Sequence, residues 1–207
     1  MNSGVRVGLW GALIAITAFS VWNFWPEPVI EREAGVLCPE IPVQTEASRR
    51  NPWLHDEFMI TALADYSISA VVLSRKDYVS GRESTLSPVD LALGWGPMSD
   101  SFVYDKLDIS QSGRWYKWKP KGLEPIPRKE IERNSANVHI LPANRAVRTA
   151  LADVYHGSIV HMSGYLVKVT ADTGWAWASS TTRDDTGHGA CEVFWVETLE
   201  VENQSRK

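Results

Sequence analysis

An uncharged apolar stretch near the amino terminus constrains this chain more than any other feature. Residues 8–25 read GLWGALIAITAFSVWNFW and contain no charged side chain. As an α-helix this stretch rises about 27 Å, close to the thickness of the hydrocarbon core of a bilayer. Trp10, Trp22 and Trp25 stand near its ends, where indoles favour the headgroup level, and Pro26 follows. The sequence therefore predicts one transmembrane anchor over residues 1–25.

Charges on the two sides of this anchor predict its orientation. Arg6 precedes it, whereas Glu27, Glu31 and Glu33 follow it, and the positive side of a membrane helix tends to be cytoplasmic. We therefore expect a single-pass inner-membrane protein with a cytoplasmic amino terminus and a periplasmic carboxy-terminal domain. A cleaved signal peptide is the alternative, but residues 17–20 (TAFS) match a small-x-small cleavage site poorly.

The rest of the chain divides into a stalk and a single domain. Residues 26–52 are rich in proline and poor in large apolar side chains, which is typical of an extended stalk. Residues 53–207 then form a β-rich domain that is long enough to bury its own core. Within it the apolar patterning predicts strands at 66–78, 114–119, 159–170, 175–181 and 192–201, and helical segments at 87–94, 127–133 and 144–155.

Few helices and several strands indicate an α+β fold with a mostly antiparallel sheet. The main helix is expected at 144–155, where Val147, Leu151 and Val154 share one face and Asn144 can cap the start. The GYLV stretch at 164–167 indicates a strand that bends at glycine. A small barrel of the oligonucleotide- or oligosaccharide-binding (OB) type is the specific expectation, and a β-sandwich is the alternative.

The two cysteines, Cys38 and Cys191, suit an oxidising compartment. A disulfide between them would pin the stalk against the domain. In the alternative, both remain thiols and Cys191 packs as a small apolar residue.

A polar run at 179–192, SSTTRDDTGHGACE, carries the richest local chemistry of the chain. Arg183, Asp185 and His188 are candidate ligand-binding residues, although Asp and Gly at this density are also typical of a simple turn between two strands. Asp185, His188 and Cys191 together define the alternative function, an envelope hydrolase. The histidines and carboxylates match no compact metal-ligand spacing, so neither a metal nor another cofactor is expected.

Aromatic residues supply the remaining candidates for a binding site. Trp175 and Trp177 are two residues apart and so share one face of a strand, on which a sugar ring or a base can stack. Packing in the core is the competing interpretation of both indoles. Trp95, in a tight turn between two glycines, and Arg114 and His139 complete the predicted binding set.

The charge balance bears on the class of partner. The chain holds 21 Lys and Arg against 25 Asp and Glu, so no overall positive field attracts a nucleic acid. The leading hypothesis is a periplasmic module that binds a protein partner or a glycan without catalysis. A subunit of a larger membrane complex is a further alternative.

Five segments together resemble a known set of sequences; they read DLALGWGPMSD, ISQSGRWYKW, NSANVHILPAN, GYLV and GWAWASSTTRDDTGHGACE. Spread over residues 58–201, they are similar to membrane-anchored proteins of Gram-negative bacteria for which no activity is known. The resemblance implies an envelope location and a single domain. It implies no activity, and so does not choose between an enzyme and a binder.

Overall fold

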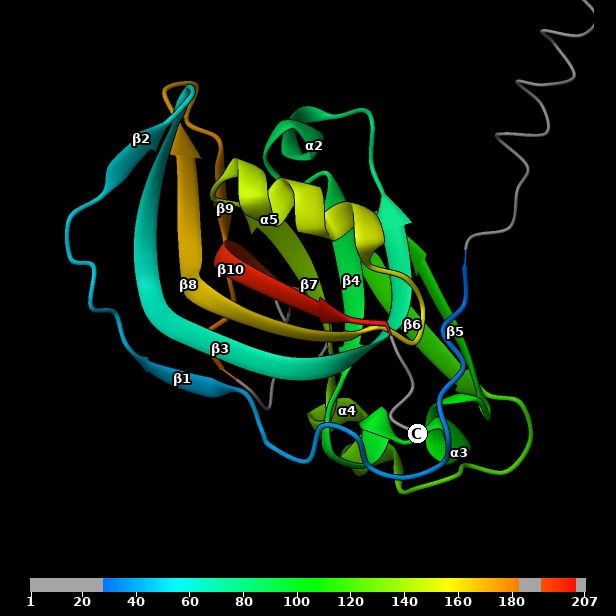
Figure 1. Cartoon of the computed structure of the whole chain (residues 1–207). Helices are drawn as coiled ribbons and strands as arrows, with labels where there is room; N and C mark the ends of the chain where they lie inside the picture. Colours follow the sequence, from blue (N-terminus) through cyan, green and yellow to red (C-terminus); the bar gives the residue numbers. More distant parts are fainter. Residues whose placement is uncertain (1–27, 183–190, 204–207) are drawn as a thin grey trace, which may run out of the picture.

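The computed structural model describes residues 28–182 and 191–203. A curved sheet dominates the molecule, with short helices at its edges and ends (Figure 1). The strands are β1 (Val43–Glu46), β2 (Trp53–His55), β3 (Phe58–Asp77), β4 (Val89–Gly94), β5 (Leu107–Ser112), β6 (Trp115–Pro120), β7 (Ser135–Pro142), β8 (Ile159–Ala171), β9 (Ala176–Ala178) and β10 (Glu192–Glu202). The helices are α2 (Arg82–Leu86), α3 (Ser101–Tyr104), α4 (Arg128–Arg133) and α5 (Arg145–Ala150), with 3₁₀ turns at Gly96–Ser99 and Leu151–Asp153.

Five of the strands pair in a closed cycle. β3 pairs with β4 and β8, β4 pairs with β7, β7 with β10, and β10 with β8. Four of these pairings are antiparallel, and the β7–β10 pairing is parallel. The predicted α+β class with a mostly antiparallel sheet is confirmed. The described strands form one eight-stranded sheet and one two-stranded hairpin, not the two facing sheets of a β-sandwich.

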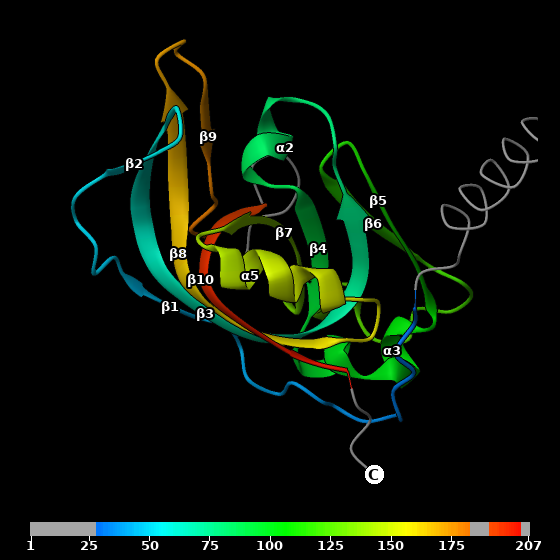
Figure 2. The ribbon, with the colours of Figure 1, turned by 45° about the horizontal axis from the view of Figure 1, so that its top comes forward.

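The length of β3 makes the cycle possible. Residues 58–71 of this strand pair with β8, and residues 71–77 pair with β4. Register shifts interrupt the ladders after Ala62 and after Val72, and such bulges bend a strand and increase its twist. β3 therefore sweeps around the molecule as one curved ribbon (Figures 1 and 2).

β8 carries the glycine at which the sequence predicts a bend. Gly164 faces Tyr66 of β3 on one side and Val196 of β10 on the other. Its φ is 155°, and a Cβ at this position would lie 2.0 Å from the carbonyl oxygen of Trp195. Only glycine allows the β10 backbone to approach so closely at this point.

The main core fills the inside of the cycle, and α5 covers one end of it (Figure 2). Val147, Leu151 and Val154 pack into that core, which is the face that the sequence predicts. Asn144 caps the helix as expected, because its Oδ1 accepts a hydrogen bond from the Val147 backbone N–H at 3.0 Å. The expected strands at 114–119, 159–170 and 192–201 are present as β6, β8 and β10.

The helical turn predicted at 87–94 is wrong, because Val89–Gly94 form the strand β4. Every residue of β4 is buried. A strand covered on both faces reads as a continuous apolar run without alternation, so its sequence, VDLALG, lacks the period of two that identifies a strand. The nearby helix is α2, which ends at Leu86, just before Ser87 and Pro88.

The proline-containing segment predicted as a stalk is largely extended and lies along the folded body. β1 pairs with β3, and Cys38 is 3% exposed. Arg32 donates a hydrogen bond from Nε to the Gly157 carbonyl oxygen at 2.7 Å and lies 3.8 Å from Glu202. These contacts extend the packed structure to the amino-terminal side of residue 53.

The predicted disulfide is absent, since Cys38 and Cys191 are both thiols. Cys38 packs with Met98 and Tyr104 beside α3, whereas Cys191 lies next to Asn137 of β7. The two residues therefore have different surroundings.

The predicted anchor over residues 1–25 lies outside the described residues. Within residues 28–182 and 191–203, no helix is both long and apolar enough to cross a membrane.

Candidate functional site

A cavity of about 430 Å³ lies between the β5–β6 hairpin with α4 on one side and the first residues of β7 and β10 on the other. Its walls combine aromatic rings, hydroxyl and amide groups, and charged side chains of both signs. The aromatic lining residues are Tyr66, Trp95, Trp115, Tyr116 and Trp118. The polar and charged ones are Gln44, Lys117, Arg128, Glu132, Arg133, Ser135, Asn137, Ser180, Thr181, Thr182 and Glu192. A volume of this size is ordinary for a small-molecule site.

Three tryptophans give this cavity its aromatic character. Trp95 is only 5% exposed, and its Nε1–H has no hydrogen-bond acceptor among the described residues. A buried N–H without an acceptor costs about 1–3 kcal/mol. Trp118 is half-buried beneath Arg128, whose guanidinium carbon lies 4.7 Å from the ring centroid. Trp115 lies on β6 in the same lining.

Tyr116 is a neutral hydrogen-bonding group in the same wall. Burial raises its pKa to about 12. Its hydroxyl donates to Ser135 Oγ at 3.3 Å, and Ser135 in turn donates to the Ile131 carbonyl oxygen at 2.7 Å. This chain of bonds fixes β6 and α4 relative to β7.

A buried ion pair lies behind the cavity wall. Asp90 of β4 is fully buried, and its Oδ1 accepts a hydrogen bond of 2.6 Å from Arg114 Nη1. The same guanidinium donates to Ser87 through Nη1 to Oγ at 3.2 Å and through Nη2 to the carbonyl oxygen at 2.9 Å. A buried carboxylate is tolerated when a charge and several hydrogen bonds compensate it.

Arg114 holds this position at a conformational cost. Arg114 follows Gly113 in the turn between β5 and β6. Arg114 has a φ of 69°, and Gly113 has a φ of 57°. Positive φ at both central positions defines a type I′ hairpin turn, which favours Asn-Gly rather than an arginine. Strained residues of this kind persist where the surroundings over-determine them, and here the ion pair with Asp90 does so.

His139 and Trp177 extend this buried cluster. His139 Nδ1 lies 2.9 Å from Asp90 Oδ1, and the His139 ring centroid lies 4.8 Å from that of Trp177. The Arg114 guanidinium carbon is 3.8 Å from the Tyr78 ring centroid and 5.7 Å from that of Trp177. The β8–β10 connection, which carries Trp177, thus packs on the same charged pair as the β5–β6 hairpin.

The Arg114 backbone links this cluster to the cavity. Its carbonyl oxygen accepts from Asn137 Nδ2 at 3.2 Å and lies 3.9 Å from Cys191 Sγ. Asn137 Oδ1 accepts from Gln111 Nε2 at 2.7 Å. Since Asn137 and Cys191 both line the cavity, the shape of the cavity depends on where Arg114 is held.

The structure brings together some of the predicted binding residues and separates others. Arg114, His139 and Trp177 form one cluster, and Trp95 lines the adjoining cavity. The Trp175 and Trp177 rings are 6.2 Å apart, as expected of one shared face, but Trp175 also packs on Phe58. The other three candidates (Arg183, Asp185 and His188) lie outside the described residues.

Four further residues of the site were not predicted from the sequence: Asp90, Asn137, Trp115 and Trp118. Asp90 has a signal in the sequence, because a single acid inside the apolar run VDLALG needs a buried partner. Asn137 has no such signal in the sequence, because its role depends on the pairing of β7 with β4 and on the β5–β6 hairpin that covers it. Within the two described ranges, no three His, Cys, Asp or Glu side chains gather to hold a metal ion.

No family model, curated protein or solved structure matches this chain. Its function is therefore inferred from the cavity and from the cluster that supports it.

Proposed function

We propose that this chain is a membrane-anchored binding module of the OB type that holds a segment of an envelope glycan in its aromatic cavity, without catalysis. The observation that carries the proposal is the composition of the cavity wall, which combines indole rings with amide and hydroxyl groups. A sugar ring has an apolar face that stacks on an indole and a rim of hydroxyls that needs hydrogen-bond partners. The cavity offers both kinds of contact.

The order of strands in the cycle supports the OB assignment. In chain order the five strands are β3, β4, β7, β8 and β10, and around the cycle the order is first, second, third, fifth, fourth. The parallel pair joins the third and fifth strands, and α5 connects the third to the fourth. OB barrels bind ligands on the face of the second and third strands, which here are β4 and β7, next to the cavity.

The anchor and its orientation belong to the same proposal. An uncharged stretch at 8–25, with Arg6 before it and Glu27 after it, supports a single pass with the domain in the periplasm. A periplasmic alkaline phosphatase fused behind Lys207 is then active, whereas a cytoplasmic fluorescent reporter at the same site is dark. The reverse pattern, or recovery of a mature chain without residues 1–25, refutes this part of the proposal.

Binding is tested on the purified full-length chain by calorimetric titration with short oligosaccharides, both neutral (N-acetylglucosamine oligomers) and acidic (galacturonic acid oligomers). Trp115→Ala should weaken binding by about 2 kcal/mol, roughly thirtyfold in Kd, as truncation of a central aromatic contact does. Phe102→Ala is the matched control, because Phe102 is an exposed aromatic residue on α3 outside the cavity lining.

The same titration separates binding from catalysis. Oligomer length, measured by mass spectrometry after long incubation, should not change. Shortened oligomers would favour a hydrolase, and Cys191→Ala would then show whether the thiol that lines the cavity takes part. Failure of every oligosaccharide to bind would contradict the proposal.

A further inference from the structure

We propose that the bound glycan is acidic, and that a carboxylate on it pairs with the basic side chains on the β6 and α4 side of the cavity. This inference rests on the proposed function, since it specifies the class of ligand for the same cavity. It starts from the uneven distribution of charge along the chain.

The segment from Arg114 to Arg133, here called the basic segment, has a net positive charge, whereas the rest of the chain has a net negative charge. It contains seven Lys and Arg against three Glu, whereas the remaining residues contain fourteen Lys and Arg against twenty-two Asp and Glu. The basic segment includes β6 and α4, which form one side of the cavity. Three cations of the basic segment (Lys117, Arg128 and Arg133) line the cavity, together with Glu132 and Glu192. The cavity wall therefore carries a small excess of positive charge on an otherwise acidic chain, which favours an anionic ligand.

Lys117 is the cation best placed to meet such a ligand. It lies on β6, is exposed, and lines the cavity. Within the described part of the chain its ammonium forms neither an ion pair nor a hydrogen bond, whereas that of Lys119 on the same strand pairs with Asp108 at 3.0 Å. Lys117 and Trp115 are two residues apart on one strand and share a face. A sugar stacked on Trp115 thus presents its substituents to the Lys117 ammonium.

α4 supplies the second part of the basic wall. The Arg128 guanidinium is held over the Trp118 ring by Glu124 at 3.5 Å and Glu132 at 3.8 Å. Arg133 at the end of the same helix also lines the cavity. These side chains donate only, and so does the buried Trp95 Nε1–H, which has no acceptor among the described residues. A carboxylate is the strong acceptor that such donors favour.

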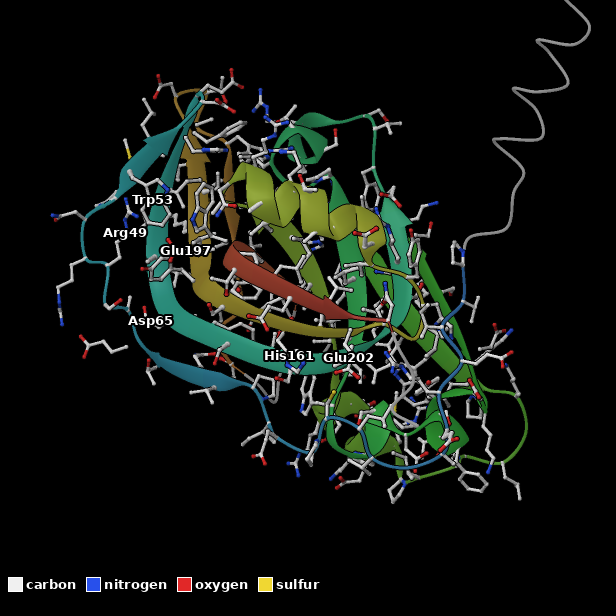
Figure 3. The ribbon with its side chains drawn as sticks, viewed as in Figure 1. Arg49, Trp53, Asp65, His161, Glu197 and Glu202 are labelled. Atoms are coloured by element: carbon white, nitrogen blue, oxygen red, sulfur yellow. The ribbon has the colours of Figure 1, made fainter. Side chains whose placement is uncertain are left out.

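The charge density of the cavity fits a glycan better than a nucleic-acid strand. Glu132 and Glu192 line the cavity together with the cations, and they would repel a backbone with one phosphate per nucleotide. Asp65 and Glu197 lie on the β3–β8 side of the molecule, far from the β5–β6 hairpin (Figure 3). A longer polyanion that extends beyond the cavity would approach these acidic side chains. A short acidic oligosaccharide, which carries few charges in total, is repelled less by both sets of acids than a long nucleic-acid strand.

The experiment compares galacturonic acid oligomers with their methyl esters on the purified full-length chain. The two ligands have the same rings and differ in the charge of the carboxyl group. We expect the acid form to bind about tenfold more tightly at low ionic strength, and most of this difference to disappear in about 0.5 M salt, where exposed charges are screened. Lys117→Gln should weaken binding of the acid form about fivefold and leave the ester unaffected.

The matched control is Lys119→Gln, a cation on the same strand outside the cavity lining. Both lysines are exposed, so neither change threatens folding, and coincident thermal unfolding curves check this. Equal affinity for acid and ester overturns the inference but leaves a glycan-binding function standing. Tighter binding of single-stranded oligothymidylate than of the acid oligomer overturns it in favour of a nucleic acid. No binding of acid, ester or N-acetylglucosamine oligomers refutes both this inference and the proposed function.

Discussion

The Arg114 guanidinium and the Asp90 carboxylate form a buried ion pair, with 2.6 Å between Nη1 and Oδ1. Arg114 belongs to the turn of the β5–β6 hairpin, and Asp90 belongs to the fully buried strand β4. The pair therefore ties the hairpin to the face of β4 and β7. Since Trp115 follows Arg114 directly, it also fixes one wall of the cavity.

Removing one partner of this pair should be costly. Asp90→Ala leaves the Arg114 charge without its carboxylate, and we expect the free energy of unfolding to fall by about 3–5 kcal/mol. The control is Asp108→Ala, which removes an exposed pair with Lys119 and should cost at most about 1 kcal/mol. Urea unfolding followed by circular dichroism measures both. Equal losses for the two variants would show that the buried pair does not hold the hairpin.

Gly164 tests the closed cycle of strands. A Cβ at this position would lie 2.0 Å from the Trp195 carbonyl oxygen, so Gly164→Ala forces β8 and β10 apart. We expect a loss of about 3 kcal/mol or more in unfolding free energy. Gly122→Ala, where a Cβ meets nothing within 4 Å, should change stability little. Similar unfolding midpoints for the two variants would contradict the β8–β10 pairing.

Alkaline pH should destabilise the fold. Burial raises the pKa of Cys38 from 9.0 to about 11, and that of Tyr104 and Tyr116 from 10.0 to about 12. The unfolded chain loses these protons first, so the stability that they contribute is complete below pH 9 and is lost as the pH rises toward 12.

The urea midpoint, measured in steps upward from neutral pH, should therefore fall in this window. Tyr116→Phe and Cys38→Ala should each make the decline shallower, whatever they do to stability at neutral pH. A midpoint that stays constant to pH 11 would contradict the burial of these groups.

The two thiols should react at different rates. Cys38 is 3% exposed with a raised pKa, whereas Cys191 is half-buried at the cavity. A chromogenic disulfide reagent should label Cys191 quickly and Cys38 slowly in the folded chain, and both quickly in denaturant. Cys191→Ala should remove the fast phase alone. Absence of reactive thiols in denaturant without reductant would instead indicate the disulfide.

Local patterns in the sequence predict those elements whose chemistry is local. The helix at 144–155 is identifiable because its cap and its apolar face lie within a dozen residues. Gly164 marks the bend of β8 because only glycine tolerates the close approach of the Trp195 backbone. β4 is not recognisable as a strand in the sequence, because burial on both faces removes the alternation that identifies a strand.

The site itself depends on pairings that no local pattern contains. Arg114 meets Asp90 only because the β5–β6 hairpin folds back on the β4–β7 face. Trp115 and Trp118 lie in a short aromatic and basic run (WYKWK), and their role at a cavity follows from the position of α4. The polar run at 179–192 contributes Ser180, Thr181, Thr182, Cys191 and Glu192 to the cavity lining, but its own composition does not indicate that β6, α4 and β7 form the rest of the wall.

The central claim, that the aromatic cavity holds a glycan, is tested most directly by the indole N–H signals in a two-dimensional NMR titration of the full-length chain. Each signal is assigned with a single Trp→Phe variant, and the ligand is a short galacturonic acid oligomer. We predict saturable shifts of the Trp95, Trp115 and Trp118 signals, because these residues line the cavity, and none of the Trp53 and Trp195 signals, because these two pack together outside it. Shifts confined to Trp53 and Trp195, or no shifts at saturating ligand, would contradict it.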